Sequence, residues 1–158
     1  MKKIIVMILS LLLSITLFAC DEDKDILFED LTVVYDANSF LEDEGYKLMK
    51  NVLLEKNDLE FEAIVCSNDE LAFGTIKALN EYGYEVPHDC LVAGFDNVDK
   101  SKLINPSLTT INIDWFKCGE TIANLALSIL EDKPCPKHIV IPANLVCRNS
   151  TKRNSTKK

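Results

Sequence analysis

The chain has 158 residues, of which 47% are hydrophobic and 27% charged, a composition typical of an ordinary globular domain. Its formal net charge of −8 argues against nucleic acid as a direct partner, because phosphate binding requires a clustered basic face. The only basic cluster lies in the polar tail 152–158, which we interpret as a solvated end of the chain.

The first twenty residues have the layout of a secretory signal peptide. Lys2 and Lys3 form a positive region, an apolar stretch follows from Ile4 to Phe18, and Ala19-Cys20 precedes a run of acidic residues. This ending resembles a bacterial lipobox, which implies cleavage before Cys20 and lipidation of its thiol. An uncleaved N-terminal anchor is the alternative, and both interpretations tether the domain to a membrane, on its exported face.

These features divide the chain into a signal peptide at 1–19, a lipidated acidic linker at 20–30, a folded domain at 31–151 and the tail. Five cysteines remain besides Cys20, and their spacing does not predict a zinc site. Cys66, Cys90 and Cys147 lie in or beside apolar runs and are expected to be buried. An odd set of thiols fits poorly with an oxidising compartment, so an anaerobic organism or a cytoplasmic ancestry is the alternative.

The folded part alternates between strand and helix patterns. Strands are predicted at 31–35, 62–66, 90–95, 108–111, 138–142 and 145–148, and helices at 40–56, 70–82 and 115–132. Gly83 is expected to stop the second helix. This order predicts an α/β fold with a mainly parallel sheet and right-handed crossovers.

Polar residues follow two of the predicted strands. Ser67-Asn68-Asp69 closes the strand at 62–66, and Asp96-Asn97 closes the strand at 90–95. The carboxyl ends of parallel strands meet at one edge of a sheet, where open α/β sheets bind small ligands. The sequence therefore favours a small-molecule binding module over an enzyme, since it shows no phosphate loop, nucleophile elbow or metal cluster.

Five motifs carry a resemblance to a known family, and they lie at 45–46, 63–72, 82–97, 106–111 and 145–151. They read Gly-Tyr, AIVCSNDELA, YGYEVPHDCLVAGFDN, PSLTTI and LVCRNST. In this order and spacing the chain resembles the ligand-sensing domain of the LacI/GalR regulators. The resemblance implies a type I periplasmic-binding-protein-like fold with a Rossmann-like parallel sheet, mainly the second subdomain of the bilobed fold, truncated.

The resemblance also implies roles for three residues. Asp96 would accept hydrogen bonds from a sugar or nucleobase, Asn68 would contact the same ligand, and Phe40 would stack on its ring. Other interpretations remain open from the residues alone. Asn68-Asp69 could cap the following helix, Asp96 could be a turn residue, and Phe40 could pack as a helix-start staple.

The resemblance covers only part of a sensor, without counterparts of the helix-turn-helix and of most of the first subdomain. The helix at 115–132 is then expected to expose an apolar face, Ile122, Leu125, Ala126 and Ile129, to a homodimer or a partner polypeptide. We expect a small-molecule sensor without cofactor, metal or enzymatic activity. The alternatives are a lipid-anchored solute receptor and an interaction subunit of a sugar-sensing or transport system.

Overall fold

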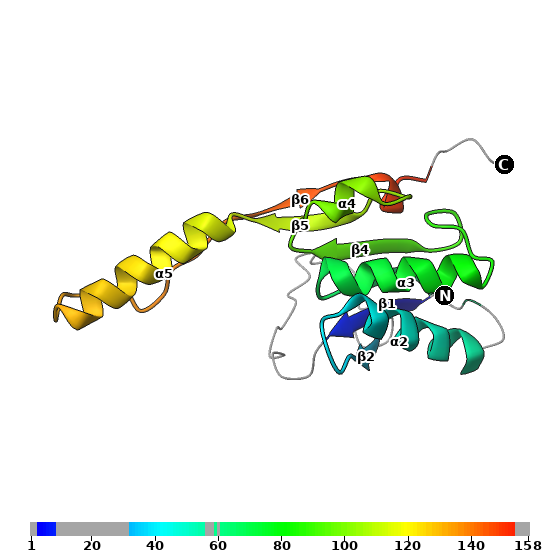
Figure 1. Cartoon of the computed structure of the whole chain (residues 1–158), viewed down its shortest axis with the longest axis horizontal. Helices are drawn as coiled ribbons and strands as arrows, with labels where there is room; N and C mark the ends of the chain where they lie inside the picture. The colour runs from blue at the N-terminus through cyan, green and yellow to red at the C-terminus, as the bar shows by residue number, and fades with distance from the viewer. Residues whose placement is uncertain (1–2, 9–31, 56–58, 60, 154–158) are drawn as a thin grey trace, which may run out of the picture.

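The computed structural model describes residues 3–8, 32–55, 59 and 61–153. Its centre is a six-stranded sheet with the order β2-β1-β3-β4-β5-β6 (Figure 1). Strands β1 to β5 pair in parallel, and β6 pairs antiparallel with β5, which confirms the predicted α/β class. The strands are β1 (Lys3–Ile8), β2 (Thr32–Asp36), β3 (Phe61–Cys66), β4 (Leu91–Phe95), β5 (Thr109–Ile113) and β6 (Ala143–Val146).

Two helices, α2 (Glu42–Glu55) and α3 (Asp69–Glu81), lie side by side on one face of the sheet (Figure 1). They approach closely because both carry glycine where they meet. A Cβ atom at Gly45 would overlap the carbonyl oxygen of Leu71, and one at Gly74 would overlap that of Glu42. Gly83, with φ of +85°, follows the end of α3 as expected.

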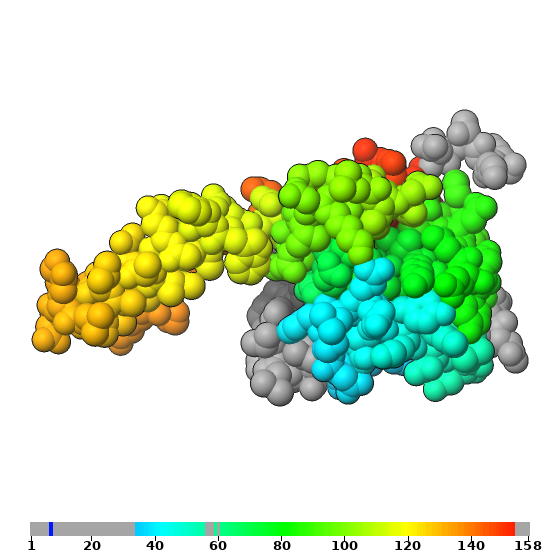
Figure 2. Space-filling model, viewed as in Figure 1, coloured from blue at the N-terminus to red at the C-terminus, as the bar shows by residue number. Residues whose placement is uncertain are grey.

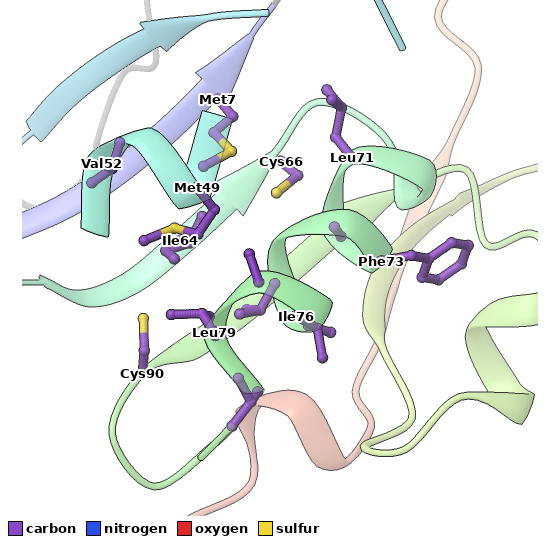
Figure 3. Close-up of a cluster of buried hydrophobic side chains, with 14 of the residues drawn as sticks. Met7, Met49, Val52, Ile64, Cys66, Leu71, Phe73, Ile76, Leu79 and Cys90 are labelled. Carbon is purple, nitrogen blue, oxygen red and sulfur yellow. The ribbon is translucent and has the colours of Figure 1, made fainter. Parts of the chain in front are cut away.

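The hydrophobic core fills the space between these helices and the sheet. Figure 3 shows Met7 from β1 and Met49 from α2 among the side chains of β3 and α3. The residues predicted to face inward from α3 are all buried, namely Leu71, Ala72, Thr75, Ile76 and Leu79. Amphipathic spacing therefore placed this helix correctly.

The structure differs from the sequence-based expectations in four places. Lys3–Ile8, inside the predicted signal peptide, form β1 in the sheet. A short helix α4 (Lys100–Leu103) occupies a stretch that lacks a clear periodicity. Residues 138–142, predicted as a strand, do not form one: in the described part of the chain, the strand that follows the last long helix is β6. The prediction that Cys147 is buried is also wrong, since Cys147 follows β6 at the end of the sheet and is exposed there.

The last long helix, α5 (Trp115–Leu130), extends away from the body of the domain (Figures 1 and 2). None of its residues is buried. Its exposed large hydrophobic side chains include Trp115, Phe116, Ile122, Leu127, Ile129 and Leu130. The chain then returns along β6 and continues into a 3-10 turn, η2 (Asn149–Thr151).

Candidate functional site

The three predicted site residues lie in the segments that follow β2, β3 and β4, at the carboxyl edge of the parallel strands. Two of them touch directly. The side-chain amide of Asn68 donates a hydrogen bond to the backbone carbonyl of Phe40, at 2.9 Å. The Phe40 side chain remains exposed and precedes the first turn of α2. The structure thus brings Phe40 and Asn68 to one edge of the sheet.

Asn68 is also the N-cap of α3. Its Oδ1 atom accepts a hydrogen bond from the backbone N–H of Leu71, at 2.9 Å, in the geometry that stabilises a helix start. The sequence left open whether Asn68-Asp69 serves as a cap, and the structure gives that position to Asn68. The nitrogen and the oxygen of the Asn68 amide are therefore both hydrogen-bonded within the protein, and these bonds hold the backbone of Phe40 next to the start of α3.

Asp69 has a different position, which the sequence did not reveal. Its side chain is fully buried, and its two carboxylate oxygens accept three hydrogen bonds. Thr110 Oγ1 donates to Oδ1 at 2.6 Å, whereas Ser101 Oγ at 2.5 Å and the Val98 N–H at 3.0 Å donate to Oδ2. A buried carboxylate is stable only when it is satisfied in this way. Asp69 therefore ties α3 to β5, to α4 and to the loop after β4.

Asp96 is the first residue of that loop. Its φ of +108° lies in a region that non-glycine residues rarely adopt, and its backbone N–H donates to the carbonyl of Ile111 at 2.9 Å. Such a conformation costs on the order of 1–3 kcal/mol and persists only where the surroundings enforce it. Partial burial, and then the nearby negative charge of Asp69, raise the pKa of the Asp96 carboxyl group.

Asn97 and Arg148 supply further restraint on the loop. Asn97 has a φ of +53°, its Oδ1 accepts from an Arg148 guanidinium nitrogen at 2.5 Å, and its Nδ2 donates to Asn112 at 2.9 Å. A second Arg148 nitrogen donates to the carbonyl of Leu108 at 2.7 Å. The arginine in the motif at 145–151 thus holds the loop that carries Asp96, a role that sequence reasoning missed.

The Ser-Thr end of the same motif is built into the sheet. The hydroxyl of Ser150 donates to the carbonyl of Val92 at 2.7 Å and accepts from the N–H of Thr109 at 2.8 Å. Thr109 and Thr151 share a hydrogen bond of 2.7 Å between their hydroxyls. These bonds connect η2 with β4 and β5, next to the loop that carries Asp96. The serine and threonine residues of the motifs at 106–111 and 145–151 therefore help to hold this loop in place.

Lys100 of α4 connects the loop region to α2 and α3. Its ammonium group pairs with the carboxylate of Glu42 and lies 4.6 Å from the ring centroid of Phe73. The first contact is partly exposed and contributes little stability, while the second adds a cation–π attraction. Together they position α4 beside the start of α2, which begins two residues after Phe40.

The edge offers an exposed aromatic ring and a carboxylate, groups that recognise a polar ring through stacking and directional hydrogen bonds, beside the Asn68 amide that is hydrogen-bonded within the protein. Among the residues that the structure describes, no group of three or more His, Cys, Asp or Glu side chains is arranged to hold a metal ion. Within the same residues, no helix combines the length and the apolar character needed to cross a bilayer.

Comparison with known proteins agrees with this architecture. Residues 27–151 match the family of the periplasmic binding protein-like domain. The chain is 38% identical to the HTH-type transcriptional repressor PurR of Mannheimia succiniciproducens, over 73% of this chain and 34% of that protein. It is 31% identical to a lactose operon repressor sequence of Rhizobium radiobacter, over 70% of this chain and 96% of that sequence.

Among solved structures, a LacI family transcriptional regulator from Enterococcus faecalis with bound ribose superimposes with a TM-score of 0.73 and 25% identity. The match covers 95% of this chain and 54% of the other. The chain also spans about a third of the length of several curated relatives, including the MelR repressor of Bacillus subtilis, of which it covers 30%. The chain therefore belongs to the periplasmic-binding-protein-like domain of the LacI-family regulators, of which it represents a part.

Proposed function

We propose that this chain is a small-molecule sensing module whose ligand, a sugar or a nucleobase, binds at the carboxyl edge of the sheet. The observation that carries the proposal is the loop of Asp96. Hydrogen bonds from Arg148 to Asn97 and from the Val98 N–H to Asp69 hold this loop in an uncommon backbone conformation. Strain of this kind is concentrated at ligand-binding and active sites.

Two further observations support a polar ligand. Among the described residues, no hydrogen bond or ion pair engages the carboxylate of Asp96, which leaves its oxygens free to accept from ligand hydroxyl or N–H groups. The hydroxyl of Ser67, at the end of β3, is buried and has no hydrogen-bond partner in the described part of the chain. Related regulators have been solved with ribose and in complex with cellobiose.

Thermal unfolding of the chain with ribose, cellobiose, lactose and purine bases tests the proposal. A ligand that binds only the folded state stabilises it by about 2.7 kcal/mol at a hundredfold excess over Kd. For a domain of this size we expect Tm to rise by roughly 5–10 °C with one of these compounds. The proposal fails if none of them moves the transition.

Asp96→Asn is the matched variant for the same measurement. Asparagine tolerates a positive φ as aspartate does, so this change removes the charge and keeps the backbone. We expect it to abolish most of the ligand-induced shift. Asp99→Asn is the control, because the Asp99 side chain is 95% exposed and lies in the same loop region. Equal shifts in the two variants would exclude Asp96 from the site.

A second function, association with another copy of the chain, is favoured by α5. The polar residues of this helix, Lys117, Glu120, Thr121, Asn124 and Ser128, fall on one stripe. Apolar side chains occupy the rest of its circumference without burial, whereas a helix of a soluble domain normally covers its apolar face. Sedimentation should show a dimer that Ile122→Asp dissociates and Asn124→Asp does not. A monomer at every concentration would contradict this proposal.

Membrane attachment through Cys20 stays a prediction, because Cys20 lies outside the described residues. Fractionation of cells that produce the wild-type chain or Cys20→Ser tests it. Lipidation predicts that the wild type partitions with membranes and that the variant does not.

A further inference from the structure

The N-terminal strand β1 lies inside the sheet rather than at its edge. It pairs in parallel with β2 on one side, from Ile4 opposite Thr32 to Ile8 opposite Asp36. On the other side it pairs in parallel with β3, and Ile5 lies opposite Ile64. The backbone of Lys3–Ile8 therefore supplies hydrogen bonds to two neighbours at once.

The end of β1 is integrated into the core as well. The side chain of Met7 is fully buried, and the hydroxyl of Thr75, in α3, lies 3.4 Å from its sulfur. The carbonyl of Met7 accepts a hydrogen bond of 2.9 Å from the N–H of Ser67, at the start of the loop after β3. Figure 3 shows Met7 beside the core residues Met49 and Cys66. Met7 thus links the strand to the edge that carries the candidate site.

Strand β2 depends on β1 for its place. It lies at the end of the sheet, and its strand partner in the described structure is β1. Neighbouring strands are about 4.8 Å apart, so β2 and β3 are separated by roughly twice that spacing and cannot bond across it. Loss of β1 would leave two rows of unpaired backbone groups, which are costly when buried. It would also detach β2, which leads into the segment of Phe40.

We propose that residues 3–8 are a structural strand of the folded sensor. A given molecule can therefore either fold this segment into the sheet or lose it by cleavage as a leader, but not both. A chain cleaved before Cys20 lacks β1 and cannot form the sheet described above. The uncleaved chain is then the form that assembles the candidate site. It does so whichever ligand the site binds.

Two proline variants of the full chain test the proposal. Val6→Pro and Leu12→Pro both interrupt the apolar stretch that resembles a leader, but only position 6 lies within β1. Proline removes a backbone donor and is not tolerated in an interior strand. We expect Val6→Pro to abolish the cooperative thermal transition and Leu12→Pro to leave Tm within a degree or two of the wild type. A Val6→Pro variant that unfolds with the same transition as the wild type would overturn the proposal.

Hydrogen exchange of the wild-type chain provides a measurement that does not depend on a variant. If Ile4 to Ile8 form the strand, their amides should exchange on the order of a hundredfold more slowly than in a free peptide, and about as slowly as those of β3. Exchange of these amides at the free-peptide rate, while β3 remains protected, would show that the sheet forms without this segment.

Discussion

The carboxylate of Asp69 lies so close to Gly94 that a Cβ atom at position 94 would overlap its Oδ1 atom. Such an atom would also lie 3.0 Å from a methyl carbon of Leu108. Gly94 belongs to β4, two residues before Asp96, and Asp69 belongs to the first turn of α3. The glycine is therefore required because a buried carboxylate occupies the space where its side chain would be.

We predict from this contact that Gly94→Ala displaces Asp69 and weakens its hydrogen bonds to Thr110 and Ser101. Overpacking of a filled interior typically costs about 1–3 kcal/mol, and a lost hydrogen bond to a buried charge adds to it. Chemical denaturation should show this decrease. Any ligand-induced shift in Tm should also shrink, because Asp69 holds the loop of Asp96. A variant as stable as the wild type would contradict the close contact.

The two glycines between α2 and α3 lead to a second prediction. Gly74→Ala should destabilise the domain by about 1–3 kcal/mol, because its Cβ atom would overlap backbone of α2 that cannot move freely. Gly119→Ala is the matched control, since no atom lies within 4 Å of a Cβ atom built there. In the exposed helix α5 this change should stabilise slightly, by up to about 1 kcal/mol. Denaturation curves that rank the two variants in the opposite order would contradict this packing.

The extent to which the sequence predicts this structure differs between elements. Helix α3 was predicted within about one residue at each end, because Asn68 and Gly83 are local signals of a helix start and a helix stop. The carboxyl edge was predicted from the polar residues that end β3 and β4. In both cases the determining residues lie next to the element that they define.

The missed features depend on contacts between distant parts of the chain. The apolar run after Lys3 fits a leader and a buried strand equally well, because both require hydrophobic side chains. Asp69 follows a helix cap, where an acidic residue is ordinary, and only its contacts with Thr110 and Ser101 reveal a buried network. Arg148 was part of a recognised motif, yet its bond to Asn97 spans 51 residues.

Cysteine reactivity provides a third prediction. Full burial raises the pKa of the Cys66 thiol to about 12, and Cys90 is buried too, whereas Cys147 is exposed. Because the thiolate is the reactive form, iodoacetamide at neutral pH should label Cys147 in the folded protein and leave Cys66 unmodified. Peptide mass spectrometry resolves the sites, and in denaturant all of them should react. Equal labelling of Cys66 and Cys147 in the folded state would contradict the burial of β3.

The raised pKa of Asp96 predicts a dependence of stability on pH. Burial and the charge of Asp69 make the folded protein hold the Asp96 proton more tightly than the unfolded chain, whose value is near 3.8. The Asp96 carboxyl group therefore stabilises the folded protein at low pH. This stabilisation is lost as the pH rises from the pKa of the unfolded chain through the raised pKa of the folded protein. Asp96→Asn has no such proton, so the variant should become more stable relative to the wild type as pH increases across this window.

Denaturation of both proteins at several pH values between about 3.5 and 7 measures this difference, and the titration of groups that do not interact with Asp96 cancels in it. Ligand binding should change in the opposite direction, because the ionised carboxylate is the stronger hydrogen-bond acceptor. Wild-type affinity should therefore increase over the same window in which its stability relative to Asp96→Asn decreases. Opposite pH dependences of stability and of affinity would identify Asp96 as a group whose ionisation destabilises the free protein and strengthens ligand binding. A stability difference between wild type and Asp96→Asn that does not vary with pH would exclude this role.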